Sequence, residues 1–234
     1  MPAKKGKGKG KKGKPEGPPP DLVLKRLRRT YKETCASLDT PMERGFMRRL
    51  ASYIEDGEDD FGNALPTQFV FPYGQDLLGP MGTRALVTTL NVAKYAHLKH
   101  LCFYRAGVTD EGVDALVDLI KARTCTVKNL ELVDNHITHV GMKFLGIAMK
   151  TNDSLLTLVL DHNRFGDEGV HDFVEQAFVP PTRQALKYLS MKHCAIGPVG
   201  AKAVADRIIN HSSLTYVATR ARFLSPVPSM VSSH

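Results

Sequence analysis

The sequence has no hydrophobic run that approaches the length needed to cross a membrane. Its longest apolar runs are only a few residues, whereas a membrane-spanning helix needs about 20. The amino terminus also lacks the apolar segment of a secretion signal. These two absences predict an intracellular, cytoplasmic protein that does not associate with a membrane.

Cysteine is scarce, and its four copies are not arranged for metal binding or redox chemistry. The spacing between them is wide and unequal, and no CxxC pair is present. This pattern argues against a zinc ribbon and against a redox motif, so we expect reduced thiols. The four residues are Cys35, Cys102, Cys125 and Cys194.

Acidic residues are almost missing from the first 20 positions, which hold seven lysines and one acid. Residues 21–60 carry a net charge of −1 and residues 61–234 a net charge of +3. Most of the total of +8 therefore lies in residues 1–20. Because residues 1–20 also lack large apolar side chains beyond Met1, they are predicted to be a disordered tail. The candidate polyanion-binding residues are Lys4, Lys5, Lys7, Lys9, Lys11, Lys12 and Lys14.

The lysine-rich residues 4–14, which we call the lysine head, do not by themselves identify a binding partner. RNA, an acidic protein surface such as that of tubulin, or no partner at all in a solubilising tail would each suit its charge. Gly8–Lys14 has the spacing of a phosphate-binding loop, but Pro15 stands where Ser or Thr would hold magnesium, and no strand precedes it. We therefore predict no nucleotide and no other cofactor.

Residues 21–60 are predicted to form a helical cap followed by an acidic loop. Asp21 follows three prolines and is the expected N-cap of the first helix, whose apolar residues recur at spacings of three and four. Thr40, Pro41 and Glu43 have the spacing of a capping box at the start of the second helix. The expected inward residues are Leu24, Leu27, Tyr31, Cys35 and Leu38 in the first helix and Phe46, Leu50 and Ile54 in the second.

The second helix should end at the acidic stretch of residues 55–60, where like charges repel and Gly57 interrupts the pattern. This stretch lacks the alternating ligands and central glycine of a calcium loop, so it is read as solvated.

From residue 98 onward the sequence repeats a unit of 28 to 31 residues. Each unit follows the pattern L-x-x-L-x-L-x-x-N/C-x-L, which is that of a leucine-rich repeat. Each repeat should place a short strand against its neighbours and return along a helix on the opposite face. The repeats start at Leu98, Val127, Leu155, Leu186 and Leu214.

The repeats define an α/β solenoid, with parallel β-strands on its concave face, helices on its convex face and the helical cap at its amino end. The repeat domain is expected over residues 61–224, with a degenerate first repeat at 68–97 in which Phe71 and Tyr73 fall in register, and a tail at 225–234. Asn135, Asn163 and Cys194 occupy the turn position whose side chain can satisfy backbone groups, so Cys194 is not a candidate nucleophile. The predicted inward strand pairs are Leu101 and Phe103, Leu130 and Leu132, Leu158 and Leu160, and Leu189 and Met191.

Repeats of this length that contain a helix resemble the ribonuclease-inhibitor class of leucine-rich repeat proteins. The resemblance covers about residues 68–224. In addition, residues 30–50 are similar to a Tyr-x-x-x-Cys, Pro, Leu element that precedes the repeats in proteins of ciliated organisms, with matches at Tyr31, Cys35, Pro41 and Leu50. With the lysine head, this element resembles axonemal or flagellar members of the class and implies a place in the cilium or flagellum.

The strand positions that alternate with the core residues should form columns on the concave face, where a partner would bind. Tyrosines are the best anchors there, because they offer large rigid area at low entropic cost. A merely solvated sheet surface is the alternative interpretation. The candidate protein-binding residues are His100, Tyr104, Glu131, Asp161, Tyr188, Lys192, Tyr216 and Arg220.

No catalytic residue or metal ligand is predicted. Asp134, His162 and His193 align at the strand ends, but no fourth ligand or nucleophile accompanies them. The favoured hypothesis is a non-enzymatic scaffold that binds one or more proteins within a larger cytoskeletal assembly. An RNA- or ribosome-associated factor that uses the lysine head is the alternative, and a GTPase regulator is a weaker one that depends on fold analogy alone.

The segment after residue 224 contains two prolines and no amphipathic helix. We therefore expect the last repeat to need cover from a partner or from the tail, over Leu186, Leu189, Leu214 and Val217. A truncated gene product would explain the same ending.

Overall fold

The protein is described by a computed structural model that covers residues 18–58, 62–74, 77–122, 124–179, 185–208 and 214–219. The seven head lysines, Arg220 and the predicted tail at 225–234 lie outside these residues.

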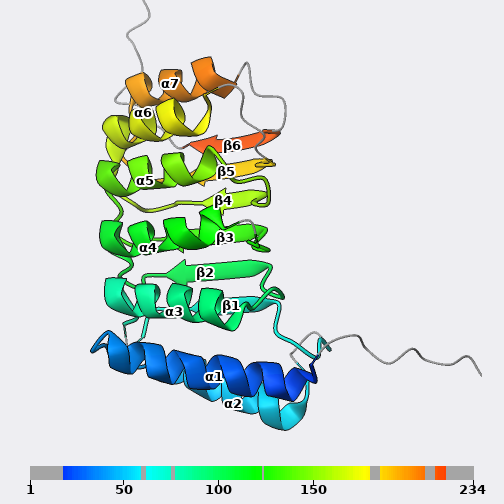
Figure 1. Cartoon of the computed structure of the whole chain (residues 1–234). Coiled ribbons are helices and arrows are strands. Elements are labelled where there is room, and N and C mark those ends of the chain that lie inside the picture. The colour runs from blue at the N-terminus through cyan, green and yellow to red at the C-terminus, as the bar shows by residue number, and fades with distance from the viewer. Residues whose placement is uncertain are drawn as a thin grey trace, which may run out of the picture.

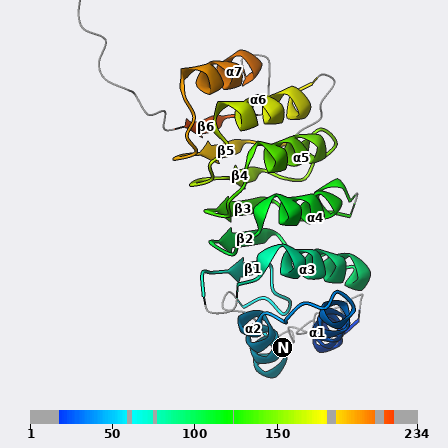
Figure 2. The same cartoon turned by 90° about the vertical axis from the view of Figure 1, so that its left-hand side faces the viewer.

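The described residues form an α/β leucine-rich repeat solenoid, as the sequence predicted. A single parallel sheet has its strands in chain order, β1 to β6. One helix follows each of the first five strands and lies on the other face, so that strands and helices stack as two layers above the cap (Figures 1 and 2). The strands are β1 Gln68–Phe71, β2 His100–Tyr104, β3 Asn129–Val133, β4 Thr157–Val159, β5 Tyr188–Met191 and β6 Tyr216–Thr219.

The helices of the repeats pack in the same sequential order as the strands. Helix α3 contacts α4, α4 contacts α5, α5 contacts α6 and α6 contacts α7, as expected when every repeat buries its core against its neighbours. Their bounds are α3 Gly79–Ala93, α4 Thr109–Lys121, α5 His139–Met149, α6 Gly166–Ala177 and α7 Pro198–Ile208.

The strand register places the same position of each repeat side by side. Leu101 pairs with Leu130, Leu130 with Leu158, and Leu158 with Leu189. All eight predicted inward strand residues are at most 1% exposed, so one continuous apolar core runs between the sheet and the helices.

The first repeat departs from its predicted register in one respect. Phe69 and Phe71 are its inward strand pair, since they lie beside Leu101 and Phe103 of β2. Tyr73 lies beyond the end of β1 and is 62% exposed, so placing it with the core positions was wrong.

The cap consists of α1 Pro20–Ser37 and α2 Arg44–Asp56. Helix α1 lies below α3 and α2 lies on the strand side, below β1 (Figure 2). The ring of Phe46 makes edge contacts with Tyr31 and Phe69, each at a centroid distance of 5.0 Å, and this cluster joins the cap to the first repeat. Leu38 and Ile54 are half-buried, while the other predicted inward residues of both helices are buried.

Both predicted N-caps are wrong by a few residues. Helix α1 has Pro19 as its N-cap, and Asp21 lies in the first turn. Helix α2 has Glu43 as its N-cap, with its carboxylate accepting from the backbone N–H groups of Gly45 and Phe46. The N–H of Glu43 donates to the Tyr31 hydroxyl at 3.3 Å, and this tertiary contact delays the helix start beyond Thr40. Helix α2 does end at the acidic stretch, with Gly57 in the left-handed conformation.

Among the described residues, none of the helices combines the length and apolar character that a membrane span requires. Leu186 and Leu189 are buried, whereas Leu214 and Val217 are half-buried. The predicted cover from the tail concerns residues outside the described ranges.

Candidate binding face on the concave sheet

The side chains that alternate with the core form two columns across the sheet, as the strand register shows. The first column runs His100, Asn129, Thr157, Tyr188 and Tyr216, and the second runs Cys102, Glu131, Val159, Ser190 and Ala218. We call the surface made by these columns, together with the exposed Tyr104 and the half-exposed Asp161 and Lys192 just beyond the strand ends, the concave face.

Two tyrosines of the concave face stack on each other. The rings of Tyr188 and Tyr216 are 4.8 Å apart between centroids and nearly parallel, at 7°. Tyr216 is 50% exposed and Tyr188 is half-buried beneath it. This stacking favours one orientation of the two rings before any partner binds.

A polar cluster joins β2 to β3 near the other end of the face. His100 Nε2 lies 2.9 Å from Glu131 Oε1, and the Cys102 thiol donates to Glu131 Oε2 at 3.6 Å. Burial, together with the nearby Glu131 carboxylate, raises the pKa of Cys102 to about 12. The thiol therefore stays protonated at neutral pH, and this cluster has no activated nucleophile.

Asp161 organises the third group on this face. Its Oδ1 accepts from the Ser190 hydroxyl at 2.6 Å and from the backbone N–H of Lys192 at 2.8 Å. Ser190 is 1% exposed, so at this position of the second column the side chain is not accessible to a partner. The side chains of Asp161 and Lys192 are both half-exposed, so this part of the face carries one negative and one positive charge.

Of the candidate protein-binding residues predicted from sequence, the structure places seven on the strands or within two residues of a strand end. Tyr104 is 48% exposed at the end of β2. His100 and Glu131 lie together, as do Asp161 and Lys192, and as do Tyr188 and Tyr216. Arg220 lies outside the described residues.

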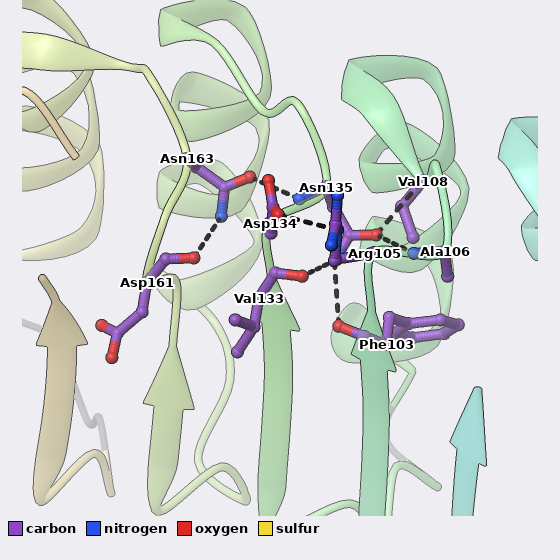
Figure 3. Close-up of polar contacts among 9 residues, drawn as sticks. All are labelled: Phe103, Arg105, Ala106, Val108, Val133, Asp134, Asn135, Asp161 and Asn163. Carbon is purple, nitrogen blue, oxygen red and sulfur yellow. Dashed lines mark hydrogen bonds and ion pairs between the residues drawn. The ribbon is translucent and has the colours of Figure 1, made fainter. Parts of the chain in front are cut away.

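The strand-end asparagines form a ladder of side-chain hydrogen bonds between repeats (Figure 3). Asn163 Oδ1 accepts from the backbone N–H groups of Asn135 and Ile137 at 3.0 and 3.1 Å. Asn135 Oδ1 accepts from Ala106 in the same way, at 3.0 Å. These side chains satisfy backbone groups that the turn leaves unpaired, so they support the face without taking part in it.

Cys194 continues this ladder with a thiol in place of the amide. It donates to the carbonyl of Leu160 at 3.2 Å and to that of Lys192 at 3.3 Å. Burial raises its pKa to about 12. The thiol is thus protonated and buried, which is consistent with the structural role predicted for it.

The aligned strand-end residues share a backbone conformation that the sequence did not reveal. Arg105, Asp134, His162 and His193 all have φ between 50° and 64°. Their side chains pair along the column: Arg105 lies 3.1 Å from Asp134, and the rings of His162 and His193 stack at 4.6 Å. Within the part of the chain that the structure describes, no three His, Cys, Asp or Glu side chains gather as a metal site would require.

The structure also contains a second surface that the sequence did not predict, where basic side chains of α1 and α2 lie beside the segment after β1. Its residues come from three separate parts of the sequence, and no motif connects them.

Comparison with known proteins supports the repeat architecture directly. A family model described as "Leucine Rich repeat" matches residues 151–173 and 184–205. The chain carries leucine-rich repeats. Repeats of this family generally mediate protein–protein interaction and are typically non-enzymatic.

The names of the similar proteins include the abbreviation LRR, for leucine-rich repeat. Human "NACHT, LRR and PYD domains-containing protein 5" is 31% identical over 121 residues, which cover 52% of this chain and 10% of that protein. Mouse "NACHT, LRR and PYD domains-containing protein 14" is 29% identical over 133 residues, covering 57% of this chain and 13% of that protein. The chain thus spans only about a tenth of the length of these relatives.

Proposed function

We propose that this protein is a non-enzymatic interaction scaffold that binds a protein partner through the concave face. The stacked pair Tyr188 and Tyr216 is the observation that carries this proposal. Interface hot spots are enriched in tyrosine, since its ring supplies large contact area with few rotatable bonds. A ring already fixed by stacking loses still less entropy on binding.

The charges of the concave face favour a protein partner over a polyanion. Glu131 and Asp161 lie on the same surface as Lys192, so the face mixes both signs. A nucleic acid would instead be met by a surface of one sign. Mixed charges around aromatic anchors provide orientation and specificity at protein interfaces.

We further propose that the assembly is cytoskeletal and belongs to an axoneme or flagellum. This rests on the lysine head and on the element at residues 30–50, with Tyr31, Cys35 and Leu50 buried in the cap. The helix in each repeat and the spacing of 28 to 31 residues support the ribonuclease-inhibitor class. Through its head the scaffold would contact an acidic surface of the tubulin kind.

The test is affinity capture with the full-length protein from ciliated cells, comparing wild type with a Tyr188→Ala, Tyr216→Ala double variant. We expect wild type to retain a reproducible protein partner and the double variant to lose it. Val140→Ala with Val199→Ala is the matched control, because both side chains are exposed on helices of the convex face, at 39% and 73%. Retention of every partner by the tyrosine variant would exclude the concave face.

Localisation of a tagged full-length protein tests the proposed assembly. Enrichment in cilia is expected, whereas nucleolar enrichment together with nuclease-sensitive partners would favour the RNA-associated alternative. Replacing the seven head lysines with glutamine should weaken ciliary retention. If it instead abolished RNA binding and left protein partners unchanged, the head would be an RNA-binding arm.

A further inference from the structure

A basic groove lies where the cap meets the first repeat, away from the tyrosine pair of the concave face. Its volume is about 1090 Å³, and its walls come from α1, α2 and the segment after β1. Figure 2 shows α2 directly below β1, which brings these segments together. The residues that matter for its chemistry are Lys32, Met42, Arg44, Arg48, Arg49 and Pro72.

Positive charge dominates the described lining of this groove. Four cationic side chains face one carboxylate, Glu43, which gives a net charge of +3. That carboxylate already accepts from the N–H of Gly45 at 2.9 Å and from the N–H of Phe46. Among the described residues, the exposed Lys32 and Arg48 make no ion pair.

One wall of the groove is held in place by Arg49. Its guanidinium donates to the carbonyl of Val70 at 2.7 Å and lies over the ring of Phe71, 5.8 Å from the centroid. These contacts tie α2 to β1, so the groove keeps its width without a ligand. Such preorganisation lowers the entropic cost of binding.

Apolar side chains accompany the charges. Met42 is 42% exposed, and Pro41 and Pro72 are exposed on the same lining. Tyr73, which follows Pro72, is 62% exposed, and the guanidinium of Arg105 lies 4.8 Å from the centroid of its ring. The groove can therefore accept an apolar side chain between its cations.

We propose that this groove binds an acidic peptide segment of a partner protein. Carboxylates of the peptide pair with the exposed Lys32 and Arg48, and an apolar side chain of the peptide packs on Met42 and Pro72. A nucleic acid suits the site less well, because the described residues that line the groove include no aromatic ring on which a base could stack. The lysine head of this chain is repelled by the like charge of the groove.

The experiment measures binding of a fluorescein-labelled twelve-residue peptide of glutamate and leucine to the full-length protein, by fluorescence anisotropy. A Lys32→Glu, Arg48→Glu double variant changes two exposed side chains on two helices. We expect its dissociation constant for the peptide to rise about tenfold, and binding to weaken with added salt. The matched control, Lys143→Glu with Lys150→Glu, makes the same charge change on exposed residues at α5 and just after it, and should leave binding unchanged.

Repeating the titration with the head lysines replaced by glutamine separates the groove from the tail. The tenfold difference in the dissociation constant for the peptide, caused by Lys32→Glu with Arg48→Glu, should persist when the head lysines are replaced. The Tyr188→Ala, Tyr216→Ala variant should bind the peptide as wild type does, so failure here is distinct from failure of the concave face.

Three results would overturn the proposal. The first is that the control variant on α5 weakens peptide binding as much as the groove variant does. The second is that a single-stranded RNA of twelve nucleotides displaces the peptide and that its own binding depends on Lys32 and Arg48. The third is self-association in sedimentation that the double variant abolishes, since a second copy of this chain would then occupy the groove.

Discussion

The backbone N–H of Asn135 donates to the side-chain Oδ1 of Asn163, one repeat further along, at 3.0 Å. Asn163 also donates from Nδ2 to the carbonyls of Leu132 and Leu160, at 2.7 and 2.8 Å. A single buried amide thus connects the turn after β3 with the backbone of β3 and with the segment after β4. Figure 3 shows its contacts with Asn135 and Asp161. The buried N–H groups of Asn135 and Ile137 both find their acceptor in this one side chain, as buried backbone groups require.

Replacing Asn163 with alanine should destabilise the protein by about 3 kcal/mol, since buried N–H groups of Asn135 and Ile137 would lose their acceptor. Urea unfolding followed by circular dichroism measures the loss. Asn129→Ala, at a half-exposed strand position, is the control and should cost less than about 1 kcal/mol. Equal losses for the two variants would contradict a special role for the ladder.

Asp110 of α4 caps the following helix across the repeat boundary. Its carboxylate accepts from the backbone N–H groups of Thr138 and Gly141 at 2.9 and 3.0 Å. Asp110→Ala should therefore cost about 1–2 kcal/mol in the free energy of unfolding. Asp114→Ala removes a carboxylate of the same helix that is paired with Arg84 on the surface, and should cost under about 1 kcal/mol. If thermal melts rank the two variants in the opposite order, the capping role is wrong.

Phe46 holds the cap on the first repeat through its contacts with Tyr31, Phe69 and Phe71. Phe46→Ala should cost about 3–5 kcal/mol, because the side chain is fully buried and leaves a cavity. Hydrogen exchange should locate the loss of protection in α1, α2 and β1. Phe144→Ala, which shortens a half-buried side chain of α5, is the control and should leave exchange in the cap unchanged. Loss of protection that began in β4 or β5 would show that the cap does not depend on this ring.

The raised thiol pKa values predict a loss of stability in alkali. Cys102 and Cys194 have an ordinary pKa of 9.0, which the fold raises to about 12. The folded state therefore favours the protonated thiol, so this contribution is fully present below pH 9 and decreases as the pH rises toward 12. Urea midpoints measured between pH 8 and pH 10 should fall for wild type.

A Cys102→Ala, Cys194→Ala variant should show a shallower decline over the same pH range, although its stability at pH 8 can be lower. Val140→Ala, which removes an exposed side chain and no thiol, is the control and should keep the wild-type slope. An unchanged slope in the double variant would mean that these two thiols do not titrate in this range.

The repeat pattern was sufficient to predict the order of the strands and the inward strand residues of the four repeats that start at Leu98, Val127, Leu155 and Leu186. Positions such as Leu130 and Leu158 recur at a fixed spacing, and each repeat contacts only its neighbours, so a local pattern determines the long-range pairing. The degenerate first repeat was predicted less well, because no strongly periodic leucines mark its strand, and Tyr73 was placed with the core.

The candidate binding face was also predictable only in part. The concave columns could be written down from sequence, since residues at equal repeat positions must lie side by side. The sequence could not show that Tyr188 and Tyr216 stack, that Ser190 is closed over by Asp161, or that His100 pairs with Glu131. These depend on side-chain conformations, which the neighbours on each strand select.

The sequence by itself determined that this protein is a repeat solenoid with an amphipathic helical cap, because periodic apolar residues can be buried in only one arrangement of strands and helices. Only the tertiary structure decided where α2 begins, since the Tyr31 hydroxyl accepts the N–H of Glu43 from another helix. It also decided that Lys32, Arg48 and Pro72 share one groove. Charges far apart along the chain meet only when the cap packs on the first strand, and no local pattern encodes that meeting.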